Sequence, residues 1–207
     1  MKILKILLLI LILSPLGLSA QQQDSIKEYG IIDAQIFPQK TFRAVYKTKI
    51  QLKENSYSGL LLVRRNADSS FRIAFVTEVG MKIFEFEFFP RKKNSFHVVS
   101  ILSYLDKKII ISTLGRDFES LFMTFTAFKQ PKIKNLGRGL STQKYCYKGK
   151  RIYTVQSNRV IGMLRKKGFF KKEEIELKSG GGNNPQYISI HHFGIELNIE
   201  MTLLNER

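Results

Sequence analysis

Tryptophan and cysteine are almost missing from this sequence, which has no tryptophan and a single cysteine, Cys146. A lone cysteine cannot form an intramolecular disulfide, so packing must stabilise the fold. Outer-membrane β-barrels need strands of about 9 to 11 residues and carry aromatic girdles. The lack of tryptophan and the many lysines at outward strand positions argue against that class of protein.

Long hydrophobic runs are also scarce. A run from Ile6 to Leu13 follows two lysines and is interrupted by Ser14-Pro15. A membrane-spanning helix needs about 20 apolar residues, so the pattern predicts a secretory signal peptide over residues 1–20, cleaved near Ala20. No cysteine stands there to accept a lipid anchor. We therefore expect a soluble periplasmic protein, which could associate with the outer membrane.

Acidic residues are half as frequent as basic ones, with 17 Asp and Glu against 34 Lys and Arg. The net charge is +17, or +15 once Lys2 and Lys5 leave with the signal peptide. Export and the lack of a nucleic-acid-binding motif exclude nucleic acid as the expected partner. The expected partner of the basic surface is then an anionic membrane surface or an outer-membrane protein assembly. The alternative is that the lysines only keep a sheet soluble and protect its edges.

Motifs for covalent chemistry are missing as well. The sequence has no G-x-S-x-G, no H-E-x-x-H and no phosphate-binding loop, and its acidic residues are spread among lysines as on a solvated face. We expect His97 at the surface. His191 and His192 are neighbours on a strand and point to opposite faces, so they cannot readily bind one metal. The sequence therefore predicts no enzyme, no metal and no cofactor.

Apolar residues are present at every second position from Thr41 to Phe89, which predicts four consecutive strands. The breaks at residues 53–56, 66–69 and Gly80 are short and suit the hairpins of an antiparallel sheet. One face of this sheet is unusually aromatic, and an acyl chain requires such apolar surroundings. The residues that we expect to bind lipid there are Phe42, Tyr46, Phe71, Phe75, Phe84, Phe86 and Phe88.

The apolar spacing changes in the middle of the chain. After a fifth strand over Ser95–Val99, a spacing of three to four residues predicts a helix from residue 101 to 114. Ser100 is the expected N-cap and Gly115 the expected stop. The β-branched run Ile109–Ile111 leaves a strand as the alternative.

The remaining elements complete one domain over residues 21–207. A second short helix, capped by Asp117, is expected to complete a lid over residues 100–126 that covers the aromatic face. Residues 129–144 are basic, contain proline and glycine, and predict a loop. Strands then resume up to a last one over residues 195–203. With about ten or eleven strands, the sheet must curl. The fold class is mainly β with a helical insertion: a strongly curved antiparallel sheet or unclosed barrel with helices over its concave face.

A short stretch near the end of the chain combines aromatic and basic residues around a glycine. A turn at Gly168 would place two rings at a membrane interface while lysines contact lipid phosphates, each worth about 1 kcal/mol near an anionic surface. The alternative is that at least one ring turns into the core. The residues that we expect to contact the membrane are Lys166, Lys167, Phe169, Phe170, Lys171 and Lys172.

The layout resembles the periplasmic lipoprotein-carrier and receptor family of the LolA and LolB type, in a branch found in Bacteroidetes-like bacteria. Four segments carry the resemblance over about 160 residues, by pattern rather than by an invariant motif. They are Thr41-Phe42-Arg43-Ala44, Tyr57-Ser58-Gly59-Leu60-Leu61-Leu62, Leu114-Gly115 and Pro185-Gln186-Tyr187-Ile188-Ser189-Ile190.

The resemblance implies a half-barrel with a helical lid over an apolar cavity that sequesters acyl chains of lipid or lipoprotein. The receptor branch has a lipid anchor and an apolar protruding loop, whereas residues 64–68 are polar here, so the resemblance favours a soluble carrier. Tryptophan, common in the cavities of the family, is missing. The alternative is a non-catalytic interaction subunit of a cell-envelope or outer-membrane assembly, whose apolar face is an ordinary filled core.

Overall fold

The structure is a computed structural model that describes residues 36–38, 40–90, 95–124, 132–146, 149–157 and 159–206. The expected signal peptide over residues 1–20 lies outside the described residues. No helix in the described part of the chain is long and apolar enough to cross a bilayer.

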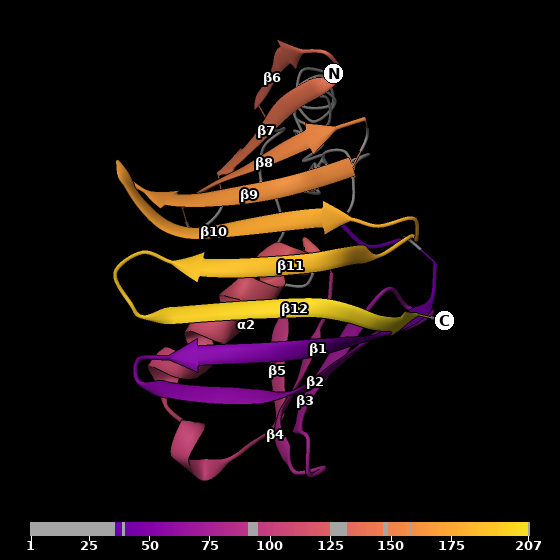
Figure 1. The fold of residues 1–207 in the computed structure, drawn as a ribbon. Helices are drawn as coiled ribbons and strands as arrows, with labels where there is room; N and C mark the ends of the chain where they lie inside the picture. Colours follow the sequence, from indigo (N-terminus) through magenta and orange to yellow (C-terminus); the bar gives the residue numbers. More distant parts are fainter. Residues whose placement is uncertain are drawn as a thin grey trace, which may run out of the picture.

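Twelve strands in the described residues form one antiparallel sheet, in the order β5-β4-β3-β2-β1-β12-β11-β10-β9-β8-β7-β6 (Figure 1). The strands β5 and β6 are the two edges, so the sheet curves without closing, as the half-barrel prediction requires. The strands are β1 (Phe42–Leu52), β2 (Asn55–Arg65), β3 (Phe71–Thr77), β4 (Lys82–Phe88), β5 (Phe96–Ile101), β6 (Lys132–Gly137), β7 (Leu140–Cys146), β8 (Lys150–Gln156), β9 (Arg159–Lys167), β10 (Phe170–Ser179), β11 (Pro185–His192) and β12 (Leu197–Glu206).

The two halves of the sheet are joined by the first strand and the last. Strand β1 pairs with β12 from Leu52 opposite Leu197 to Ala44 opposite Glu206, with one register shift between Val45 and Tyr46. Every other neighbouring pair is connected by a short turn or loop along the chain. The sheet therefore consists of two meanders, β1–β5 and β6–β12. They are joined by the pairing of β1 with β12, which forms only when the two ends of the domain meet.

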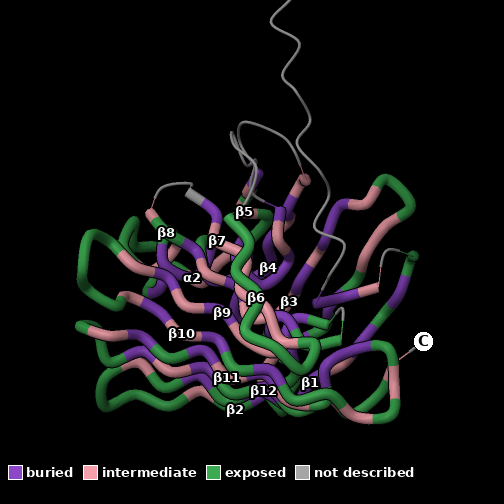
Figure 2. Tube along the Cα trace, turned by 90° about the horizontal axis from the view of Figure 1, so that it is seen from above, coloured by how far each residue is buried: buried purple, intermediate pink, exposed green. Residues whose placement is uncertain are grey.

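One helix, α2 (Lys108–Phe122), lies inside the curve of the sheet, preceded by the short 3-10 helix η1 (Ser103–Leu105) (Figures 1 and 2). The prediction of two helices divided at Gly115 is wrong. Gly115 lies inside α2, where a Cβ atom would be 2.8 Å from the Phe96 ring. The glycine therefore lets the helix approach β5 closely, and it does not end the helix.

The beginning of α2 also differs from the prediction. Ser100 is part of β5, and Lys107 is the N-cap residue, without a side-chain cap hydrogen bond. The β-branched run at Ile109–Ile111 is helical, so the strand alternative is wrong. Ile109 is 67% exposed, because it lies on the solvent side of an amphipathic helix whose buried side is Leu114, Phe118, Leu121 and Phe122.

Residues 129–144 were predicted to form a loop, and this prediction is wrong for the described part. Residues 132–137 and 140–146 form the hairpin of β6 and β7, with a turn at Arg138 and Gly139, both at positive φ. All six residues of β6 are exposed. An edge strand that is exposed on both faces needs no apolar alternation, and the period-two signal is therefore missing.

Burial along the other strands follows the predicted alternation (Figure 2). In β1 the residues at positions 42, 44, 46, 48 and 50 are buried, and the intervening residues are exposed or half-buried. The fifth strand is confirmed, with His97 exposed. The inward side chains and the buried side of α2 form one hydrophobic core.

Candidate functional site

The seven predicted lipid-binding residues lie together on the concave face. Phe42 and Tyr46 come from β1, Phe71 and Phe75 from β3, and the other three from β4. All seven are at most 5% exposed. We call Phe42, Tyr46, Phe71, Phe75, Phe84, Phe86 and Phe88 the aromatic wall. Their grouping follows from the period-two pattern, while their binding of lipid stays a prediction.

Helix α2 packs directly on the aromatic wall. The Phe122 ring stacks on Phe71 with ring centroids 4.4 Å apart, and it meets the Phe88 ring edge-on at 5.4 Å. Phe118 lies 6.2 Å from Phe88 and 6.3 Å from Phe84. These contacts fill the space between the wall and the helix with side chains. The structure is therefore a closed arrangement, in which side chains of the helix cover the aromatic wall.

The opposite side of α2 contacts the sheet through polar and charged groups. Glu119 accepts hydrogen bonds from Arg151 Nη2 on β8 at 3.1 Å and from Ser95 Oγ at 2.6 Å. Arg151 Nε also donates to Ser120 Oγ at 3.0 Å, and the Tyr153 hydroxyl donates to the Ser120 carbonyl at 2.8 Å. Arg151 and Tyr153 are fully buried. These bonds join the helix to both halves of the sheet.

Two further buried pairs lie nearby, one of them at Asp117, two residues before Glu119 on the helix. Asp117 Oδ2 is 2.9 Å from His192 Nε2 on β11, and Arg165 Nε on β9 donates to Glu173 Oε2 on β10 at 2.5 Å. Asp117 and Glu173 are fully buried, and within the described ranges neither Asp117 Oδ1 nor Glu173 Oε1 has a hydrogen-bond partner. Burial, followed by the nearby Asp117 carboxylate, raises the pKa of Glu173 to about 7.

These groups form one row across four strands. Arg151 is the cross-strand partner of Arg165, Arg165 of Glu173, and Glu173 of His192. We call Arg151, Arg165, Glu173 and His192, together with Asp117 and Glu119 of α2, the charged seam. Two guanidinium groups face three carboxyl groups there, in addition to the histidine. Burial in this dry site, and after it the Asp117 carboxylate, outweighs the cations nearby and raises the pKa of Glu173.

The sequence prediction missed the charged seam, because it assigned the acidic residues to a solvated face. That assignment is wrong for Asp117, Glu119 and Glu173, which are buried. A signal was present, since each strand residue of the seam is two positions from a buried apolar residue and so shares its face. The pairs are Arg151 with Tyr153, Arg165 with Met163, Glu173 with Ile175, and His192 with Ile190.

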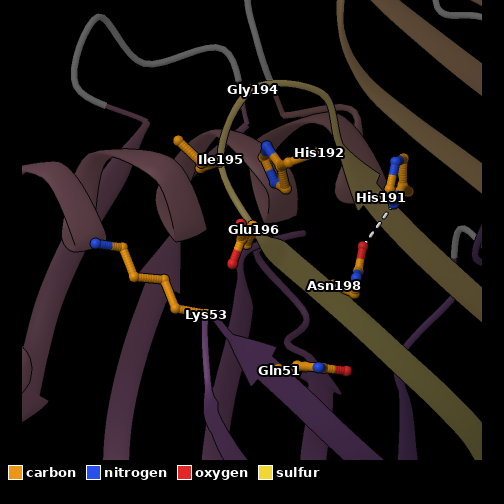
Figure 3. A pocket seen from close by; sticks show the side chains of 8 residues that line it. All are labelled: Gln51, Lys53, His191, His192, Gly194, Ile195, Glu196 and Asn198. Carbon is orange, nitrogen blue, oxygen red and sulfur yellow. Dashed lines mark hydrogen bonds between the residues drawn. The ribbon is translucent and has the colours of Figure 1, made fainter.

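His191 and His192 point to opposite faces, as predicted, and only His192 joins the seam. His191 is exposed and lies 2.6 Å from Asn198 Oδ1 through its Nδ1 (Figure 3). It takes part in an open surface pocket of about 480 Å³ at the ends of β1, β11 and β12, beside a smaller one of about 260 Å³. The larger pocket is lined by Gln51, Lys53, His191, His192, Gly194, Ile195, Glu196 and Asn198.

Neither pocket suits an acyl chain, because polar side chains dominate both linings. The residues that the structure describes contain no cluster of three or more His, Cys, Asp or Glu that could hold a metal ion. The concave face, with its aromatic wall, charged seam and covering helix, is therefore the candidate functional site.

The six predicted membrane-contact residues form the tip of the hairpin between β9 and β10. Phe169 and Phe170 are 99% and 73% exposed, so neither ring turns into the core. The exposure of both rings excludes the alternative that at least one of them is part of the core. Lys166 and Lys172 are half-buried, and Lys167 and Lys171 are exposed. Contact with a membrane stays a prediction.

Comparisons with known proteins identify the fold. No protein-family model and no curated protein matches the sequence. A LolA superfamily protein from Nitrosomonas europaea is similar in structure, with a TM-score of 0.52 and 10% identity over 85% of this chain and 89% of that chain.

Two further structures are more distant. A putative outer membrane lipoprotein-sorting protein domain from Vibrio parahaemolyticus gives a TM-score of 0.46 and 6% identity over 82% of this chain and 86% of its own. A DUF1329 family protein from Desulfovibrio piger gives a TM-score of 0.47 and 8% identity over 82% of this chain and 85% of its own. The fold of this chain is similar to that of the LolA superfamily, as the sequence resemblance predicts.

Proposed function

We propose that this protein is a non-enzymatic periplasmic carrier that sequesters the acyl chains of lipid or lipoprotein between the aromatic wall and α2. The observation that supports this most is the two-sided contact of the helix. One side of α2 packs on the apolar aromatic wall, which offers the surroundings that an acyl chain requires. The other side of α2 is bound to the sheet by charged and polar groups.

The charged seam makes the helix a separable cover. Buried ion pairs gain little over their hydrated, separated state, because desolvation offsets most of the attraction between the charges. When α2 moves away, water can hydrate Asp117, Glu119 and their partners. The apolar surface that opens, in contrast, has no compensation from water and favours an acyl chain in place of the helix.

The structure also supports a second candidate, a non-catalytic interaction subunit of a cell-envelope assembly with a filled core. The full burial of Phe75, Phe84, Phe86 and Phe88 against neighbouring side chains favours it. In that case α2 is a permanent part of the core. The two candidates differ in whether an acyl chain can enter the concave face.

Photo-crosslinking separates the two candidates. A peptide that carries a diacyl group with a photoreactive carbon is expected to label residues 71–88 and 114–122, and unlabelled diacyl peptide should compete. Ala44 lies on the concave face and Ala74 on the opposite face. Ala44→Leu narrows the space beside the wall, so labelling should fall several-fold, whereas the control Ala74→Leu should label like the unchanged protein.

Two outcomes would contradict the carrier. One is the absence of labelling by the acylated peptide above that of the same peptide without acyl chains. The other is a native mass spectrum, after mild purification, of a lipid-free protein in a stoichiometric complex with another protein, which would favour the interaction subunit.

A further inference from the structure

The exposed rings of the β9–β10 hairpin are part of a larger surface at one end of the sheet. The Lys172 carbonyl accepts a hydrogen bond from the Phe193 amide at 3.1 Å, and the Lys171 ammonium lies 5.5 Å from the centre of the Phe193 ring. The hairpin therefore contacts the β11–β12 loop. We call residues 166–172 and 193–196 the basic aromatic edge.

Topology extends this surface toward the middle of the sheet. In an antiparallel meander every second turn lies at the same end, and the connections of β9–β10, β11–β12 and β1–β2 lie side by side at the left of Figure 1. The Lys53 amide of the β1–β2 turn donates to the Glu196 carbonyl at 2.7 Å, which joins the third turn to the second.

The two ends of the sheet differ in composition. At the end with the basic aromatic edge, the turns expose large apolar side chains, including Ile195 and, between β3 and β4, Val79 and Met81. At the other end, Phe89 and Pro90 of the β4–β5 connection are half-buried, and the described residues of the other four turns are small or polar. They are residues 66–69, 138–139, 157 and 180–184. An exposed aromatic tip is therefore a feature of one end and not of turns in general.

The charged residues of the hairpin tip itself are of one sign. Residues 166–172 contain four lysines and no acidic residue. The Lys172 ammonium lies 5.8 Å from the centre of the Phe170 ring, so a cation and an aromatic face are presented together. Exposed rings that enter the interface and lysines that reach lipid phosphates are the pattern of an interfacial anchor.

We infer that the basic aromatic edge docks this protein on an anionic phospholipid bilayer, with Phe169 and Phe170 inserted between headgroups. A protein partner would leave unexplained why rings of 99% and 73% exposure stand at the tip of a hairpin whose charged residues from 166 to 172 are all lysines. Docking is independent of cargo binding, because the edge lies at the end of the sheet and the aromatic wall lies inside it.

Vesicle sedimentation tests this inference with the full mature protein. Vesicles of equal parts phosphatidylcholine and phosphatidylglycerol should bind it, and pure phosphatidylcholine should bind it at least tenfold more weakly. Phe169→Ser/Phe170→Ser should lower the partition coefficient about a hundredfold. Replacing the four lysines by Gln should lower it about a thousandfold.

Matched controls lie on the outer face of the sheet. Leu60→Ser/Leu62→Ser removes two exposed apolar side chains from β2, and Lys47→Gln/Lys49→Gln removes two exposed lysines from β1. Both should bind vesicles within a few-fold of the unchanged protein. Melting temperatures should stay the same in the hairpin variants, because the replaced rings are exposed.

Three results would overturn the inference: no binding to the anionic vesicles, equal binding to pure phosphatidylcholine, or equal losses in the hairpin variants and their controls. The acyl crosslinking described above, carried out in solution on the hairpin variants, should be unchanged. A failure of docking and a failure of the carrier function are therefore distinguishable.

Discussion

At the residue scale, the most unusual group is Glu173, a carboxyl on the inner face of β10. It lies between Arg165, with which it is hydrogen-bonded, and the Asp117 carboxylate and His192. Burial raises its pKa from the ordinary 4.5 to about 7. The folded protein therefore holds a proton that the unfolded chain would release at lower pH.

This shift gives the stability of the protein a defined pH dependence. A raised pKa in the folded state contributes stability below about pH 4.5, and that contribution is lost as the pH rises to about 7. At about 1.4 kcal/mol for each unit of pKa, the loss is on the order of 3 kcal/mol. Glu173→Gln cannot titrate, so its free energy of unfolding should lack this decline.

Urea denaturation at about pH 4.5 and about pH 8 measures the difference for both proteins. Glu174→Gln is the matched control, since Glu174 is the adjacent residue and points to the other face of the strand. A decline of the same size in Glu173→Gln and in the unchanged protein would contradict the assignment of the proton to this carboxyl.

At the scale of elements, α2 is held differently from the strands around it. The strands β1 and β12 are hydrogen-bonded to a neighbour on both sides. The helix contacts the sheet through side chains, on one side through rings and on the other through the charged seam. An element of this kind can leave the sheet without breaking the ladders of backbone hydrogen bonds.

Arg151→Met should loosen α2 selectively. The Glu119 carboxylate would lose the cation at 3.1 Å and stay buried, which costs about 3 kcal/mol in the closed state. Amides of α2 should then exchange with solvent deuterons about a hundredfold faster, with those of β1 and β12 affected less. Arg159→Met, on an exposed residue of β9, is the control. Equal acceleration in the helix and in the central strands would show that α2 is not a separable element.

At the scale of the whole molecule, the pairing of the first strand with the last determines whether there is one sheet or two. Strand β12 is the final element of the chain, yet it lies between β1 and β11. The pair of Leu52 and Leu197 is separated by most of the domain in sequence. Contacts of this range carry a large cost in chain entropy and form late, which makes folding slow.

Removal of residues 197–207 should therefore abolish cooperative unfolding. Without β12, the sheets β1–β5 and β6–β11 have no backbone ladder between them, and α2 loses a continuous surface. Thermal melting by circular dichroism should show no sharp transition. Removal of residues 206–207 alone costs the contacts of Glu206 with Asn184 and should keep the transition. A cooperative transition in the longer truncation would contradict the role given to β12.

The sequence by itself determined the strands and the faces of their side chains. Phe42, Phe75 and Phe86 follow the period-two rule, and the structure buries all three. For the hairpin tip at Gly168 the sequence left open whether a ring turns into the core, and the structure exposes both Phe169 and Phe170. The strands and the turn at Gly168 depend on local alternation and on turn chemistry, which neighbouring residues decide.

Only the tertiary structure decided the length of α2, the hairpin of β6 and β7, and the charged seam. Gly115 serves close packing of α2 on the Phe96 ring and does not end the helix, and Glu173 is buried beside Arg165 on the face that α2 covers. Each of these outcomes depends on a partner that is distant in the sequence. Local pattern cannot identify such partners, because burial and charge pairing arise only when the curved sheet closes around its helix.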